Sequence, residues 1–236
     1  MKKFWNFTST EEENILRIDG YIAETSWLED EVTPKQFAKE LSVVKGDLVL
    51  FINSGGGDCF AASQIYTMLQ EHKKNNAKIT VKIDGIAASA ASVLAMAGDE
   101  ILMSPTSLIM IHNPASLIFG EVSDLEQGIE MLNEVKESII NAYVLKTGLS
   151  RPKISHLMDA GTWMNAKKAI DMGFADGMMY GNDNKSTDDK TEAFMWNSNS
   201  MVMSVAAAMR KKLSQKKSQT GTPIESLEKR LFLISH

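Results

Sequence analysis

The sequence predicts an α/β domain with a mostly parallel sheet, and three features of the chain support this fold class. Short runs rich in β-branched residues alternate with segments of helical apolar periodicity. Glycines separate the two kinds of segment, at 55–57 and at Gly85 for example. The run 48–52 is continuously apolar, which is typical of a strand covered on both faces of a parallel sheet.

The first hundred residues contain three predicted strands and three predicted helices. Residues 14–23 alternate between apolar and polar side chains, which is the pattern of a half-buried strand. Thr33 before Pro34 is typical of a helix N-terminus, so a helix is expected to continue to Val44. The following elements are expected in the order strand 48–52, helix 60–73, strand 78–83, turn 84–86 and helix 87–97.

The rest of the domain contains two short strands and three helices. Apolar residues recur at helical spacing over some six turns between 123 and 146, which predicts a long amphipathic helix. Gly173 follows the last predicted helix as its C-terminal cap. The remaining elements are expected to be strands 100–103 and 108–111 and helices 152–158 and 165–172.

Charge is distributed unevenly along the chain. The whole sequence has a net charge of −5, but residues 204–236 contain seven basic and two acidic residues, a local balance of +5. Residues 1–181 carry a net charge of −8, and a polar run begins at Gly181. We therefore expect one domain over 1–181, followed by a polar and basic extension over 182–236, partly disordered and with one short helix, that serves for docking or is self-processed.

Composition excludes several classes of protein. The acidic balance argues against a nucleic-acid binder, which needs basic residues to neutralise phosphates. A single cysteine, Cys59, excludes an internal disulfide and a cysteine-rich zinc site. No apolar run approaches the roughly 20 residues that span a bilayer, and the N-terminus lacks the apolar stretch of a secretory signal. We expect a cytoplasmic protein without a membrane partner.

The glycine run 55–57 follows a predicted strand and requires a physical reason. It lacks the Lys-Ser/Thr ending of a P-loop and the spacing of a dinucleotide-binding fingerprint. A loop without Cβ atoms can present its N–H groups to a substrate carbonyl or to an incoming peptide strand. The alternative is a tight turn that uses left-handed backbone conformations.

The second glycine-containing turn places Ser89 among small residues at the start of a predicted helix. Free N–H groups at a helix N-terminus favour negative charge near the serine oxygen, as a nucleophile requires. The amide of Ala90 could then help to bind the oxyanion of a tetrahedral intermediate. Ser92, three residues on, is interpreted as a packing residue or a hydroxyl bonded back to the main chain. Ser89 itself could be only a packing residue.

A serine nucleophile needs a base, and the chain has four histidines. His236 ends the polar tail, His72 is expected on a solvated helix end, and His156 is expected on the surface of a short helix. His112 follows the apolar strand 108–111 and precedes a turn, so it lies at the C-terminal edge of the predicted sheet. Sites of open α/β sheets gather at such edges, which makes His112 the candidate base.

Three ordered motifs give the sequence a family resemblance. Residues 52–57, 85–89 and 109–114 match, in order and with similar spacing, three motifs of the Clp protease proteolytic subunit (ClpP) family. Residues 163–176 are similar to the segment that follows that family's third triad residue. The resemblance extends over about residues 14–180.

The resemblance implies a fold and two site residues. The fold is crotonase-like, built from repeated β-β-α units, with the helix 123–146 as a handle between stacked rings. Ser89 is implied as the nucleophile and His112 as the base. The pair Thr162-Trp163 and the short N-terminus are similar to the phage and prophage branch, whose members act as head maturation proteases.

The third triad residue departs from the family pattern. The family's acid lies two residues before the aromatic residue that Trp163 matches, and that position is Gly161. The nearest acid is Asp159. Two interpretations remain open: Asp159 completes a triad, or the protein works as a Ser-His dyad with weak activity.

The predicted activity is that of a serine endopeptidase, either ATP-independent or assisted by an unfoldase, for head maturation in a prophage capsid. The amides of Gly56 or Gly57 and of Ala90 would bind the oxyanion, and no metal or organic cofactor is required. The resemblance implies polypeptide substrates, a homo-oligomeric ring (a heptamer or stacked double ring), and capsid, scaffold or AAA+ unfoldase partners.

Three alternative functions stay open. A signal peptide peptidase of the same fold uses a lysine base, against which His112 and the lack of a membrane anchor argue. A crotonase-type acyl-CoA enzyme also forms an oxyanion hole from amides next to glycines, but does not need a Ser-His pair. A weak or inactive capsid assembly protein would keep the ring without the chemistry.

Overall fold

The computed structural model describes residues 4–10, 13–22, 34–74 and 76–180, and it divides the chain into two units, 1–185 and 186–236. The described residues form a sheet of eight strands. The strands are β1 (Trp5–Ser9), β2 (Asn14–Ile22), β3 (Leu48–Gly57), β4 (Ile79–Ala88), β5 (Glu100–Met103), β6 (Leu108–Ile111), β7 (Thr162–Asn165) and β8 (Gly177–Met178). The helices are α1 (Pro34–Leu41), α2 (Cys59–Lys73), α3 (Ala90–Ala95), α4 (Val122–Thr147), α5 (Arg151–Asp159) and α6 (Ala166–Asp171).

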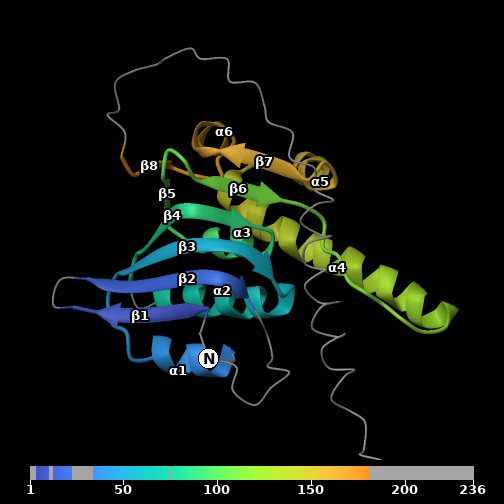
Figure 1. The fold of residues 1–236 in the computed structure, drawn as a ribbon, viewed down its shortest axis with the longest axis horizontal. Helices are drawn as coiled ribbons and strands as arrows, with labels where there is room; N and C mark the ends of the chain where they lie inside the picture. Colours follow the sequence, from blue (N-terminus) through green and yellow to red (C-terminus); the bar gives the residue numbers. More distant parts are fainter. Residues whose placement is uncertain (1–3, 11–12, 23–33, 75, 181–236) are drawn as a thin grey trace, which may run out of the picture. The chain divides into compact units, whose positions relative to one another are not determined.

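The sheet is mainly parallel. Strands β2, β3, β4, β5 and β8 pair in parallel in that order, and β6 pairs in parallel with β4 (Figure 1). Only the pairs β1–β2 and β6–β7 are antiparallel within the described sheet. The predicted α/β class with mostly parallel pairing is therefore confirmed.

Strand β4 has two different neighbours along its length. Its first half, Thr80 to Ile83, pairs with β5, and its second half, Ile86 to Ala88, pairs with β6. The register with β3 also shifts at this point, between Ile52 and Ser54. The strand that precedes Ser89 is therefore enclosed by β3 on one side and by β6 on the other.

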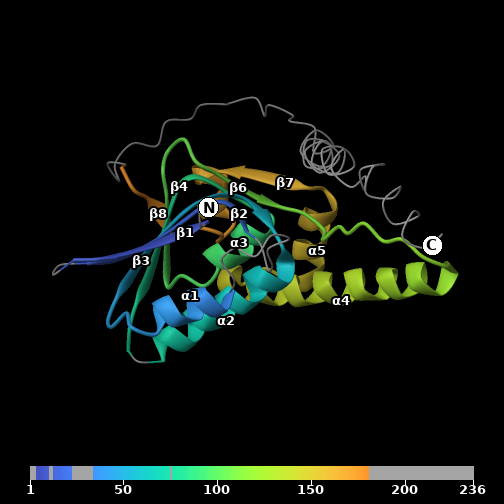
Figure 2. The same ribbon diagram turned by 60° about the horizontal axis from the view of Figure 1, so that its bottom comes forward.

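The core lies between this sheet and the helices that cover one of its faces. Ile18, Ile52 and Ile83 pair across three parallel strands and are all fully buried. Helix α3 packs against both β3 and α2. Helices α1, α2 and α4 lie together on one side of the sheet in Figure 2. Burial of these aliphatic side chains is the main source of stability in such a layered fold.

Helix α4 is half packed and half free. Its C-terminal half contributes buried residues, including Ile140 and Tyr143, to the core. Its N-terminal half projects past the sheet (Figures 1 and 2), and Val122 and Ile129 are 71% and 61% exposed there. The helix begins at a capping box and ends at Gly148 in a left-handed conformation. The predicted helix 123–146 is confirmed almost to the residue.

Several expectations about local structure were wrong. The expected turn 84–86 lies within β4, which continues to Ala88 because Ile86 to Ala88 pair with β6. Strand β3 likewise continues through the glycines 55–57, and the small-residue helix begins only at Ala90. His72, expected on a solvated helix end, is buried, and its Nε2–H donates to the carbonyl oxygen of Gly46 over 2.9 Å.

Three short strands, β1, β7 and β8, were not predicted. Strand β1 pairs with β2, and the ring of Trp5 meets that of Phe37 in α1 edge-on, with 5.3 Å between centroids. Strand β7 exists because it pairs with β6 across more than 50 residues of sequence. Such pairing leaves little trace in a local pattern.

Parts of the sequence-based prediction lie outside the described residues. These are the extension 182–236, its short helix and the Thr33 cap. Within the described part of the chain, no helix has the length and apolar character to cross a membrane.

The Ile52→Ala substitution tests the packing at the centre of the sheet. Truncating this fully buried side chain leaves a cavity and should lower the free energy of unfolding by about 2–5 kcal/mol. Val43→Ala, at a position that is 77% exposed, should change it by less than about 0.5 kcal/mol. Urea denaturation at one protein concentration measures both, and equal losses would contradict the assigned core.

Candidate active site

Ser89 occupies the junction between β4 and α3 in a conformation that L-residues rarely adopt. Its φ is 55° and its ψ is −127°, and among the described non-glycine residues only Asn76 shares a positive φ. The Ser89 N–H donates to the carbonyl oxygen of Met110 in β6 over 2.9 Å. Backbone strain of this kind concentrates at functional sites, and a sharp strand-to-helix turn exposes a serine hydroxyl.

His112 lies beside this serine at the end of the neighbouring strand. Residue Ala88 pairs with Met110, so the parallel strands β4 and β6 bring their C-terminal ends together. The His112 Nε2 atom is 2.7 Å from the Ser89 Oγ atom, which is hydrogen-bond distance. Burial lowers the pKa of His112 from its ordinary value of 6.5. The imidazole is therefore neutral near pH 7 and able to accept a proton.

Asp159, the last residue of α5, binds other partners. Its Oδ1 atom accepts hydrogen bonds from the Lys136 Nζ atom over 2.6 Å and from the Asn113 Nδ2 atom over 2.9 Å. These two bonds, Lys136 first, lower the pKa of the Asp159 carboxyl. Within the described residues no hydrogen bond joins Asp159 to His112. The structure thus brings Ser89 and His112 together. It joins Asp159 by a hydrogen bond to Asn113, the residue that follows His112.

The glycine loop approaches Ser89 at one residue. A Cβ on Gly56 would lie 2.7 Å from both the Ala88 carbonyl oxygen and the Ser89 Cβ, so only glycine allows this approach. A Cβ on Gly57 would instead lie 2.1 Å from the carbonyl oxygen of Ile22 in β2. Of the two predicted glycines, Gly56 is the one against Ser89, and Gly57 lies against the neighbouring strand.

The two amides that flank Ser89 differ in their present partners. Ala90 is the first residue of α3, and N–H groups at that position have no acceptor within the helix. The Gly56 N–H donates to the Ser54 Oγ atom over 3.1 Å, and that hydroxyl donates in turn to the Gly20 carbonyl oxygen. The hydrogen bond from the Gly56 N–H to the Ser54 hydroxyl must break before this N–H can bind another oxygen.

Four residues near the site received no active-site role from the sequence. Ser92 was interpreted as packing or back-bonded, and its Oγ atom does donate to the Ser89 carbonyl oxygen over 2.6 Å. Tyr143 and Lys136 belong to α4 and are brought to the site by tertiary packing, whereas Asn113 follows His112 directly in the chain. The only sequence feature that could have singled out one of them is Tyr143, a tyrosine among the aliphatic residues of the long helix.

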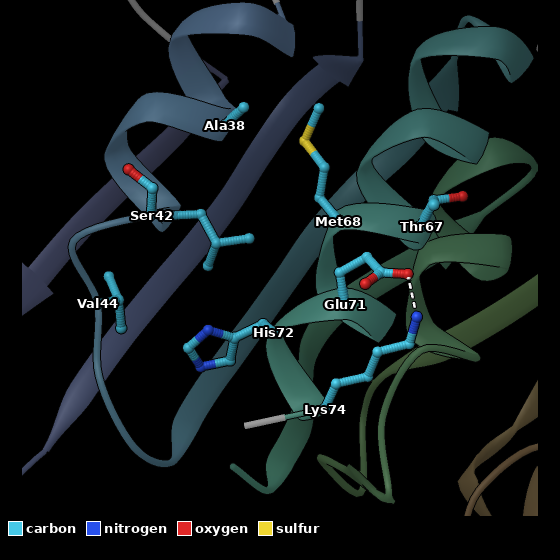
Figure 3. A pocket seen from close by; sticks show the side chains of 9 residues that line it. Ala38, Ser42, Val44, Thr67, Met68, Glu71, His72 and Lys74 are labelled. Carbon is cyan, nitrogen blue, oxygen red and sulfur yellow. Dashed lines mark hydrogen bonds and ion pairs between the residues drawn. The ribbon is translucent and has the colours of Figure 1, made fainter. Parts of the chain in front are cut away.

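A separate cavity lies between α1 and α2 and contains none of the predicted site residues. It has a volume of 640 Å³, and Figure 3 shows His72 and Met68 at its wall with the Glu71–Lys74 ion pair near its edge. Ser89 and His112 do not line it. No three His, Cys, Asp or Glu side chains in the described ranges are close enough together to hold a metal ion.

The fold and the site together define a class of protein. A hydroxyl on a strained strand-to-helix turn, bonded to a neutral imidazole at the end of the adjacent parallel strand, is the arrangement of serine hydrolases. Residues 11–182 match the family model described as Clp protease, and the chain belongs to this family. The family resemblance of the sequence motifs is thereby confirmed.

The relatives in this family are proteolytic subunits. The chain is 34% identical over 137 residues to ATP-dependent Clp protease proteolytic subunit 1 of Chlamydia abortus, covering 56% of this chain and 70% of that protein. It is 32% identical over 151 residues to the subunit of the same name from Protochlamydia amoebophila, covering 62% of this chain and 71% of that protein. Membership of this family makes a protease the supported class of activity.

Gly56→Ala tests the close approach of the glycine loop to Ser89. The added Cβ would meet main-chain atoms, and its φ of +100° is unfavourable for alanine, so the free energy of unfolding should fall by about 1–3 kcal/mol. Gly55→Ala is the matched control, because nothing lies within 4 Å of its Cβ position and its φ is not positive. If thermal or urea unfolding showed equal effects, the assigned loop geometry would be wrong.

Proposed function

We propose that this chain is a serine endopeptidase in which Ser89 is the nucleophile and His112 the general base. The observation that carries the proposal is the 2.7 Å contact between the His112 Nε2 and Ser89 Oγ atoms. A neutral histidine at this distance can take the hydroxyl proton as the oxygen attacks. Membership of the Clp protease family supports a peptide bond as the substrate.

The proposed reaction proceeds by acyl transfer. The Ser89 Oγ atom attacks the peptide carbonyl carbon while its proton passes to the His112 Nε2 atom. The tetrahedral intermediate collapses when His112 gives this proton to the leaving amine, and the acyl group remains on Ser89. Water, deprotonated by His112, then releases the acid and restores the serine. The chain's own residues supply each proton transfer.

Two backbone amides are proposed to bind the oxyanion. The Ala90 N–H is one, and the Gly56 N–H is the other after it exchanges the Ser54 hydroxyl for the substrate oxygen. Gly57 shapes the loop from the side of β2, where only a residue without Cβ fits. The open loop would also pair with an extended substrate, as strand-adding recognition sites do.

Asp159 is proposed to act on His112 through its neighbour. Its carboxylate holds the side chain of Asn113, the residue after His112, and Lys136 keeps that carboxylate ionised. This arrangement restrains the main chain that carries the imidazole, as a weaker substitute for a direct acid–imidazole bond. Asp159→Asn should therefore reduce the rate far less than loss of Ser89.

Assembly of the chain into a homo-oligomeric ring is proposed from an uncovered apolar surface. The surface comprises the free half of α4 and the loop before it, and its exposed apolar residues are Leu117, Phe119, Val122, Leu125 and Ile129. Large apolar side chains exposed within one segment favour a site of interaction with another protein surface. The relatives' name as ATP-dependent subunits supports an unfoldase partner.

The finer identity is also a proposal. The Thr162-Trp163 pair supports the phage and prophage branch, and hence head maturation with capsid or scaffold proteins as partners. Residues 1–181 would form the protease domain, and 182–236 a docking or self-processed extension. The close Ser89–His112 contact favours an active enzyme over an inactive assembly protein, which would not need it.

Ser89→Ala and His112→Ala test the mechanism directly. Each should lower peptide cleavage on the order of 10⁴- to 10⁶-fold, because nucleophile and base act as a unit. Ser63→Ala, at an exposed position on α2, should leave cleavage unchanged. Peptide turnover and labelling by a fluorophosphonate probe are the measurements. Cleavage and labelling that survive Ser89→Ala would exclude this mechanism.

The pH dependence of kcat/KM tests the environment of His112. Because burial lowers the pKa of His112, the base stays neutral to a lower pH than a solvated imidazole does. Activity should fall as the pH drops through a midpoint below 6.5, and an NMR titration of the His112 ring should give the same midpoint. A midpoint above 6.5 would show that the imidazolium form is stabilised instead.

A further inference from the structure

A buried chain of hydrogen bonds connects helix α4 to the main chain of Ser89. The Tyr143 hydroxyl lies 2.7 Å from the Ser92 Oγ atom, which lies 2.6 Å from the Ser89 carbonyl oxygen. Ser92 is fully buried and Tyr143 is only 1% exposed. Fifty-one residues separate these two side chains in sequence, so the contact depends entirely on the packing of α4 against α3.

The chemistry of the three groups fixes the direction of every hydrogen bond. A carbonyl oxygen only accepts, so the single Ser92 hydroxyl hydrogen is donated to Ser89. Ser92 can then only accept from Tyr143, which donates. Burial raises the pKa of Tyr143 far above its ordinary value of 10, so this donor hydrogen is retained at all working pH values. The network has one hydrogen arrangement and no unsatisfied member.

The carbonyl that receives these bonds belongs to the strained residue. In a planar trans peptide the C=O and the following N–H point in opposite directions. Holding the Ser89 carbonyl oxygen toward Ser92 therefore turns the Ala90 N–H the other way, out of α3. The Ser92 N–H adds a second bond to the same oxygen over 2.9 Å, so the Ser89–Ala90 peptide is restrained in its unusual ψ.

We propose that Ser92 and Tyr143 are positioning residues that set the orientation of the Ser89–Ala90 peptide from helix α4. This inference rests on the proposed function, because it assigns the Ala90 N–H to the oxyanion. The Tyr143 ring is itself fixed in the core against Phe174, with 5.6 Å between ring centroids. The same helix carries the exposed apolar surface at its other end. Displacement of α4 would thus change the orientation of the Ala90 N–H through the hydrogen bonds from Tyr143 to Ser92 and from Ser92 to Ser89.

A double-mutant cycle tests the relay. Ser92→Ala removes the two hydrogen bonds of the Ser92 hydroxyl but keeps the bond from the Ser92 N–H to the Ser89 carbonyl oxygen. It should lower kcat about 10- to 100-fold, and Tyr143→Phe should lower it about 3- to 10-fold, with KM within twofold in both. Because Tyr143 acts through Ser92, the double variant should be no slower than Ser92→Ala alone. Tyr66→Phe, which removes the hydroxyl of a half-buried tyrosine on α2, should match the wild type.

Two outcomes overturn the relay. One is an unchanged kcat in folded Tyr143→Phe, even if its unfolding midpoint falls, since that makes the pair purely structural. The other is a double variant whose losses multiply. The NMR resonance of the Ala90 amide gives a readout independent of activity, and it should shift in Ser92→Ala and Tyr143→Phe but not in Tyr66→Phe. If wild-type cleavage did not depend on Ser89, the proposed function would fail, while this amide shift would still decide the positioning claim.

Discussion

The parallel pairing of the second half of β4 with β6 is the constraint on which the site depends. It places Ala88 opposite Met110. Ser89 follows Ala88 directly, and His112 lies two residues after Met110. The hydrogen bond from the Ser89 N–H to the Met110 carbonyl oxygen extends this pairing into the turn. The 2.7 Å contact between Ser89 and His112 follows from register rather than from any long-range attraction between the two side chains.

The strained turn at Ser89 is stable because it is held on three sides. Strand β6 binds its N–H, Ser92 binds its carbonyl oxygen, and the Cβ-free loop at Gly56 lies against its side chain. A φ of 55° at a non-glycine residue costs roughly 1–3 kcal/mol, which surrounding contacts must offset. Small buried residues, Ala88, Ala90 and Ala91, allow these contacts to be close.

Helix α4 reaches the site by two routes of different strength. The route through Tyr143 is buried and fully hydrogen-bonded, so it keeps its geometry. The route through Lys136 ends on Asp159, whose side chain is 52% exposed, and solvent screens an exposed ion pair of this kind. The acid is therefore the loosely held part of the site. The position that the family pattern reserves for it is Gly161, which has a φ of 60°.

The sequence by itself determined what depends on neighbours in the chain: the alternation of strands and helices, the long amphipathic helix, and the candidate residues Ser89 and His112. Local propensity and motif spacing carry that information. Only the tertiary structure decided the 2.7 Å contact, the choice of Gly56 over Gly57 beside Ser89, the partners of Asp159 and the link from Tyr143. Each of these joins residues that are brought together by strand register or helix packing, and no local pattern encodes which distant groups will meet.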